Sequence, residues 1–98
     1  MNTPVIRKLI RADGTETDLH GPHAMQDVKQ MIGATTVGAI RLRDRVHVML
    51  VDDDGYDKEL PVNAEATRLY HEVCLPGTTW QIVGDVVIVP DFDYASGA

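Results

Sequence analysis

The alternation of apolar and polar residues predicts two β-hairpins. Between residues 37 and 54, apolar side chains recur at every second position on either side of a short turn at 44–45, and this two-residue period is that of a β-strand. Near the N-terminus, segments 4–11 and 15–19 flank an Asp-Gly pair at 13–14. Glycine adopts a positive φ without steric cost, so this pair favours a tight turn between two strands.

Two further segments have the spacing of an amphipathic helix. The first is predicted to begin near the Gly-Pro pair at 21–22 and to stop at Gly33, because proline suits the first helical turn and glycine suits the residue after a helix. The second is predicted to begin at Asn63, a good N-cap, and to end at the Pro-Gly pair at 76–77. The apolar stripe of this second helix consists of Ala66, Leu69, Tyr70, Val73 and Cys74.

The last apolar segments predict the centre of the sheet. Segments 81–83 and 85–89 are predicted strands separated by a bend at Gly84, and the second of them is apolar on both faces, as central strands are. The order β-β-α-β-β-α-β predicts an α+β fold, with a mixed or mostly antiparallel sheet of about five strands and two helices on one face. This order also matches the layout of a β-grasp domain. We expect one domain at 1–90 and an acidic C-terminal tail at 91–98.

Composition and charge narrow the class of protein. The chain has 98 residues and a formal net charge of −6, which disfavours general nucleic-acid binding because that depends on neutralising phosphates. A single cysteine excludes an internal disulfide and fits a reducing cytoplasm. No apolar run approaches the ~20 residues that span a bilayer, and the N-terminal residues lack the apolar segment of a signal peptide. We therefore expect a cytoplasmic protein without membrane contact.

Two late segments resemble a known family. Residues 60–70 are similar to the Leu-Pro-x-Asn-x-x-Ala-Thr-x-Leu segment of a domain-of-unknown-function family of small phage and plasmid proteins. Residues 82–89 are similar to the closing strand of the same family. The resemblance implies a phage or plasmid origin, and with it a location in the host cytoplasm, but it implies no catalytic residue. The acidic loop at 52–57 departs from the family pattern.

That acidic loop does not have the pattern of a calcium site. An EF-hand loop needs oxygen ligands at its first and twelfth positions and glycine at its sixth. With Gly55 at the sixth position, Leu50 and Pro61 take the first and twelfth positions, and neither has a carboxylate. We expect a solvated acidic loop instead, because blocks of like charge usually stay in water.

Zinc binding and catalysis are also disfavoured. His20 with His23, and His71 with Cys74, have the number and spacing of zinc ligands, but Cys74 lies on the apolar stripe of its helix and is expected to behave as a small buried hydrophobe. The C-terminal end of a helix also disfavours a reactive thiolate. No phosphate-binding loop, dinucleotide motif or nucleophile motif is present. We therefore expect no metal, no cofactor and no enzymatic activity.

A basic group of residues is the first candidate for a binding site. Arg41, Arg43, Arg45 and His47 are expected to project from one face of the second hairpin. Guanidinium groups form bidentate hydrogen bonds with phosphates and carboxylates. The alternative is a solvent-facing strand whose arginines pair with the acidic loop.

Aromatic residues late in the chain provide further candidates. Phe92 and Tyr94 lie in the acidic tail, where they either pack back on the domain or dock a partner. Trp80 precedes the last strand and either caps the core or lines a pocket.

The sequence favours a small phage-like accessory protein that binds and perturbs a host protein without catalysis. Its net negative charge suits an interaction module, and so does the expected contrast between a basic hairpin face and an acidic loop and tail. The alternative is a protein that sequesters a small anionic ligand or a nucleotide with the Arg41/Arg43 face. Nucleic acid is disfavoured as a partner, and the sequence favours no oligomeric state.

Overall fold

Short strands and helices alternate over residues 4–95, the part of the chain that the computed structural model describes. In chain order the elements are β1 (Lys8–Ile10), β2 (Glu16–Asp18), α1 (Met25–Ile32), β3 (Val37–Arg41), β4 (His47–Asp52), α2 (Ala64–His71), β5 (Val86–Pro90) and α3 (Phe92–Ala95).

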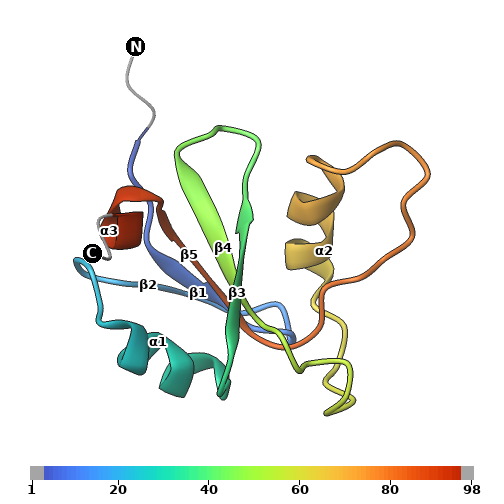
Figure 1. Ribbon diagram of the computed structural model, residues 1–98, viewed down its shortest axis with the longest axis horizontal. Helices are drawn as coiled ribbons and strands as arrows, with labels where there is room; N and C mark the ends of the chain where they lie inside the picture. Colours follow the sequence, from blue (N-terminus) through green and yellow to red (C-terminus); the bar gives the residue numbers. More distant parts are fainter. Residues whose placement is uncertain (1–3, 96–98) are drawn as a thin grey trace.

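The five strands form one sheet in the order β2-β1-β5-β4-β3, and every neighbouring pair is antiparallel. As predicted, β5 lies in the centre, and all five of its residues are buried. The hairpins β1-β2 and β3-β4 lie on either side of it (Figure 1). The prediction of an α+β fold is therefore confirmed, with the sheet antiparallel throughout rather than mixed.

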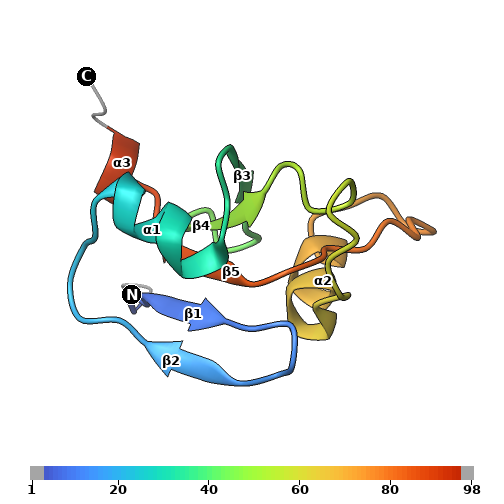
Figure 2. The same ribbon diagram turned by 90° about the horizontal axis from the view of Figure 1, so that it is seen from below.

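Two apolar cores lie on the two faces of this sheet. Val87 and Val89 of β5 pack with Val28 of α1, whereas Val86 and Ile88 pack in the core that contains α2. Successive residues of a strand point to opposite faces, so α1 and α2 cover opposite faces of the sheet (Figures 1 and 2). The expectation of both helices on one face is wrong. The physical reason lies in β5, because a strand that is apolar on both faces needs a cover on each.

Both main helices are shorter than predicted. Ala24 is still extended, with φ −63° and ψ 150°, so α1 begins at Met25 rather than near residues 21–22. It stops, as predicted, at Gly33, which has the left-handed φ of 67°. The second helix, α2, ends at His71. Val73 therefore lies beyond the helix and is 39 % exposed, not part of the core stripe.

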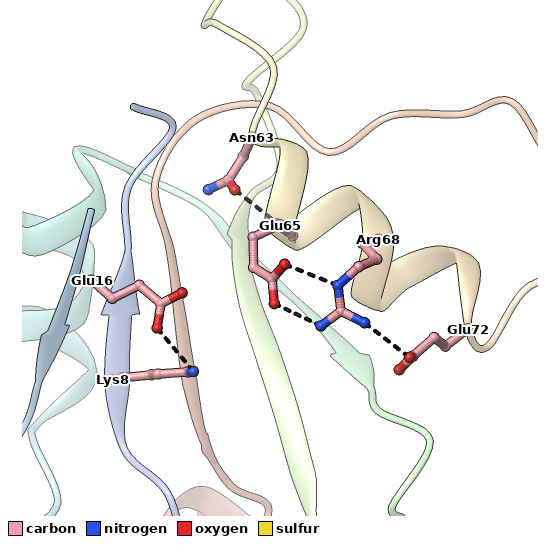
Figure 3. Close-up of polar contacts among 7 residues, drawn as sticks. Lys8, Glu16, Asn63, Glu65, Arg68 and Glu72 are labelled. Carbon is pink, nitrogen blue, oxygen red and sulfur yellow. Dashed lines mark hydrogen bonds and ion pairs between the residues drawn. The ribbon is translucent and has the colours of Figure 1, made fainter. Parts of the chain in front are cut away.

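The N-terminal end of α2 confirms the predicted cap. The Asn63 side-chain oxygen accepts a hydrogen bond from the Ala66 N–H at 3.0 Å (Figure 3). On the solvent side of the helix, Arg68 lies between Glu65 and Glu72, with N···O distances of 2.7 and 3.1 Å. Ion pairs thus occupy one side of α2, while Ala66 is buried in the core on the other.

The segment before β5 is not a strand of the sheet, although a strand is predicted at 81–83. Only an isolated antiparallel bridge joins Val83 to Val62. The backbone of Ile82 is held instead by α2, since its N–H donates to Thr67 Oγ1 at 2.9 Å and its carbonyl accepts from the Asn63 N–H at 2.8 Å. Gly84 then forms the predicted bend, with a φ of 79°.

The described part of the predicted tail packs on the domain. Asp93 of α3 accepts two hydrogen bonds from the Arg7 guanidinium, at 2.7 and 2.8 Å, and its side chain is only 2 % exposed. The Tyr94 hydroxyl donates to the His23 carbonyl at 2.6 Å, and its ring packs against the α1 core. Residues 96–98 of the predicted tail lie outside the described residues.

Candidate functional site

The predicted basic residues do not share one face of the hairpin. Arg41 stands opposite Val48 and therefore faces the α1 side, where it pairs with Asp91 at 3.0 Å. Arg43 and Arg45 lie in the exposed turn between β3 and β4. The expected basic face of Arg41, Arg43, Arg45 and His47 is thus divided between the sheet and the turn.

His47 is a structural residue in this arrangement. It is 1 % exposed and lies two residues from Met49, on the α2 side of the sheet. Its Nδ1 lies 2.6 Å from Asp44 Oδ2, and its Nε2 accepts a hydrogen bond from the Ile6 N–H at 2.9 Å. Because Nε2 is the acceptor, the ring proton is on Nδ1 and is donated to Asp44. The placement of His47 on an exposed binding face is therefore wrong.

Asp44 organises the same turn through its carboxylate. Burial alone would raise the pKa of Asp44, but hydrogen bonds from the backbone N–H groups of His47 and Val46 and from the His47 ring outweigh it and lower that pKa. The carboxylate is thus held in its charged form, where it closes the turn.

The two predicted tail aromatics have different environments. Tyr94 is engaged in the fold through His23, as described above, so it is not a free docking residue. Phe92 is 60 % exposed at the start of α3. The sequence left packing and docking open for this pair, and only Phe92 remains accessible.

The structure instead presents a cleft on the α2 side of the sheet, with a volume of about 340 Å³. Its floor comes from the β3-β4 hairpin, where Ile40 and Val51 line it. Aromatic side chains from three different segments form its walls, namely Tyr56, Tyr70 and Trp80. Concave, mainly apolar sites with a few polar groups are typical of ligand binding.

Two of the aromatic rings form a pair at the rim. The ring centroids of Tyr56 and Trp80 are 4.7 Å apart and the planes are tilted by 47°, a common arrangement of interacting aromatic rings. The Tyr56 hydroxyl donates to the Gln81 carbonyl and accepts from the Gln81 N–H at 3.1 Å. The loop at 53–59 is thereby tied to the segment before β5.

Trp80 is held by its backbone while its side chain remains accessible. Its carbonyl accepts a hydrogen bond from His71 Nε2 at 2.7 Å, and the next residue but one, Ile82, is anchored to α2. Trp80 is nevertheless 58 % exposed. An anchored and exposed tryptophan is the kind of residue that dominates the energy of many protein interfaces.

The cleft has a negative charge at its edge. The charge is the carboxylate of Asp53, which lies against Gly38 at a place that a Cβ on residue 38 would overlap. The residue before it, Asp52, is buried and pairs with Lys58 at 2.7 Å. Within residues 4–95, Asp53 takes part in no ion pair, so it is the free carboxylate of the cleft.

The remaining aromatic wall residue stays neutral. The pKa of Tyr70 is raised above its ordinary value, mainly by a hydrogen bond with the Cys74 thiol and to a smaller extent by burial. Tyr70 therefore contributes a neutral phenol at pH 7, and the charge in the cleft comes from aspartate.

The cleft adjoins an open edge of the sheet. The Leu42 N–H donates to the His47 carbonyl and the Asp53 N–H to the Thr36 carbonyl, which fixes the even-numbered residues of β3 as the ones bonded to β4. The N–H and C=O groups of Val37, Ala39 and Arg41 consequently point away from the sheet. No hydrogen bond to these groups occurs within the described part of the chain.

Most of this site is not apparent from the sequence. Trp80 was expected either to cap the core or to line a pocket, and it lies at the cleft. Tyr56 belongs to the loop that was expected to be acidic and solvated, and nothing in its local pattern indicates the contact with Trp80. The detectable signal was the combination of an exposed-loop tyrosine, a tryptophan before the last strand and the glycine at Gly38.

Comparisons with known proteins do not add a family. No protein-family model, no curated protein and no solved structure matches the chain. Within residues 4–95, His, Cys, Asp and Glu side chains form no group that could hold a metal ion. None of the helices described has both the length and the apolar character to cross a membrane.

Proposed function

We propose that this protein is a non-catalytic interaction module that binds a partner protein through the aromatic cleft beside β3. The observation that carries the proposal is the exposed Trp80–Tyr56 pair, anchored by backbone hydrogen bonds at the mouth of a 340 Å³ cleft. Tryptophan and tyrosine are enriched at protein interfaces, and rigid anchors reduce the entropy that binding costs.

A host protein is the proposed partner. The resemblance to small phage and plasmid proteins favours a role in which the chain binds and perturbs a component of the host cytoplasm. The net charge of −6 supports a partner with a basic surface, because complementary charge increases the rate of association.

Binding is favoured over catalysis by the chemistry of the cleft. Its walls supply aromatic rings and its edge supplies one free carboxylate, Asp53. A general acid or base normally works with a second polar group aimed at the same reacting atom. The cleft is therefore proposed as a recognition surface.

The alternative from the sequence, a binder of small anions or nucleotides at Arg41 and Arg43, has less support. Arg41 already pairs with Asp91, and Arg43 lies in the turn rather than beside it on a sheet face. Guanidinium groups that converge on one ligand are what such a site requires.

Capture of host proteins by two matched variants tests the proposal. Trp80→Ala and Phe92→Ala each remove an aromatic residue of similar exposure, 58 % and 60 %, but only Trp80 lines the cleft. We expect the protein to retain one near-stoichiometric partner from host lysate with Phe92→Ala and to lose it with Trp80→Ala. Equal retention by both variants would contradict the proposal. Thermal melts of both variants confirm that each is folded.

A further inference from the structure

We infer that the partner adds an extended, basic peptide segment to the open edge of β3 and places a lysine or arginine side chain against Trp80 and Asp53. This inference rests on the proposed function and specifies its ligand class. Strand addition supplies affinity through main-chain hydrogen bonds and specificity through pockets for alternate side chains.

The two edges of the sheet differ in charge. The other edge strand, β2, has the sequence Glu-Thr-Asp and is fully exposed, and charged residues are one way in which proteins discourage strand pairing. In contrast, Gly38 and Ala39 at the centre of β3 carry no charged side chain, and the one charged residue of this strand, Arg41, is paired with Asp91. The centre of the edge beside the cleft therefore lacks the charged protection of the opposite edge.

The edge formed by β3 also has the hydrogen-bonding groups that a further strand would need. Val37, Ala39 and Arg41 present outward N–H and C=O groups without a partner within the described residues. A strand normally pairs at about 4.7–4.9 Å from its neighbour. A peptide segment at this distance lies directly beside Ala39, which also lines the cleft.

The charge and the aromatic rings of the cleft favour a basic side chain. A cation over an indole face is attracted by the ring quadrupole, and the free Asp53 carboxylate lies in the same cleft as Trp80. Neutral Tyr70 and the Tyr56 ring provide an apolar wall for the aliphatic part of the side chain. A basic side chain can contact the aromatic rings and form an ion pair with the Asp53 carboxylate at the same time, whereas an acidic side chain would be repelled by that carboxylate.

Selection from a displayed library of random ten-residue peptides provides the probe. The full-length protein is used as bait, and an enriched peptide is labelled with fluorescein and titrated by fluorescence anisotropy. We expect the enriched peptides to carry Lys or Arg within alternating apolar residues. Trp80→Ala should weaken binding by about 30-fold, the effect of a strong interface residue. Asp53→Asn should weaken it by about threefold and reduce its dependence on salt.

A matched pair of proline variants tests the edge itself. Ala39→Pro removes one outward N–H of β3 without removing a bond to β4, and Asp18→Pro removes an outward N–H of β2. We expect about tenfold weaker binding for Ala39→Pro and no change for Asp18→Pro. Amide hydrogen exchange on the unmodified protein gives a second readout, in which the peptide should protect Val37, Ala39 and Arg41.

The outcomes separate this inference from the proposed function. Enriched peptides without a basic residue, or an absence of protection of the β3 amides, would overturn the inference. If Trp80→Ala still abolished binding in that case, the cleft would remain the interface and the proposed function would stand. If no peptide is enriched, a linear basic segment is not the ligand and the inference is overturned. Peptides that bind Trp80→Ala as well as the unmodified protein would overturn both proposals.

Discussion

Asn63 joins three segments of the chain through a single buried side chain. Its Nδ2 donates to the carbonyls of Ile10 and Gly84 at 3.1 and 2.9 Å, and its oxygen caps α2 at Ala66. The residue is 1 % exposed, so these bonds are shielded from solvent. One amide thus fixes where β1, α2 and the turn before β5 meet.

Replacement of this residue should be costly for its size. Asn63→Ala removes the cap together with the side-chain donor to two buried carbonyls, so we expect the free energy of unfolding to fall by about 3 kcal/mol. The neighbouring variant Glu65→Ala, which breaks only an exposed ion pair, should cost less than about 1 kcal/mol. Urea denaturation measures both, and equal midpoints for the two variants would refute the role given to Asn63.

At the scale of elements, the fold depends on the central strand being covered twice. One face of β5 packs under α1 and the opposite face under α2. The cleft exists because α2 and the segment before β5 lie on the same side as Ile40 of the edge strand. The placement of α2 therefore determines both half of the core and the walls of the candidate site.

A pair of identical substitutions tests where the helices end and what they bury. Val28→Ala in α1 removes methyl groups at a fully buried position and should cost about 2 kcal/mol. Val73→Ala lies beyond the end of α2 at a 39 % exposed position and should cost less than about 0.5 kcal/mol. A loss at Val73 as large as that at Val28 would mean that α2 continues past His71, as the sequence pattern had indicated.

At the scale of the whole molecule, several carboxylates stabilise the fold in their charged form. A hydrogen bond from Thr15 lowers the pKa of Asp13, and one from Arg68 lowers the pKa of Glu65. The pKa of Asp44 is lowered as well, by the hydrogen bonds from His47 and Val46. A carboxyl whose pKa is lower in the folded state stabilises that state above its ordinary pKa near 4, and this contribution is lost as pH falls through the folded value.

The stability of the protein should therefore change little between pH 7 and pH 5 and fall below about pH 4. Urea midpoints measured across this range test the expectation. The variant Glu65→Gln should lose stability at pH 7 and show a shallower fall in acid, since it lacks one of the groups that titrate. A midpoint that rises as pH falls from 5 to 3 would contradict the assignment of these pKa shifts.

Local patterns predicted the parts of the molecule whose causes are local. The Asn63 cap, the stop at Gly33 and the central position of residues 86–89 each follow from residues within a few positions. The side of the sheet that α2 covers does not, because it depends on how a long connection returns to β5. The burial of His47 is likewise not a local property, since the donor to its Nε2 is the backbone N–H of Ile6, which is distant in the sequence.

The candidate site was the least predictable feature, because no single segment contains it. Tyr56, Trp80 and Gly38 come from a loop, the approach to β5 and the edge strand. The sequence around each of these residues is typical of a loop or a strand, and only the folded structure brings the three together. The basic residues had the stronger signal in the sequence, yet the fold separates them.

Site-specific photo-cross-linking in host lysate tests the central claim most directly. A photoreactive phenylalanine derivative is introduced at one of three exposed positions: Gln81 in the cleft, Arg43 in the β3-β4 turn, or Phe92 on α3. If the cleft is the interface, illumination should produce a covalent adduct with one host protein from position 81 and little from 43 or 92. An adduct formed from position 43 or 92 but not from 81 would contradict the account.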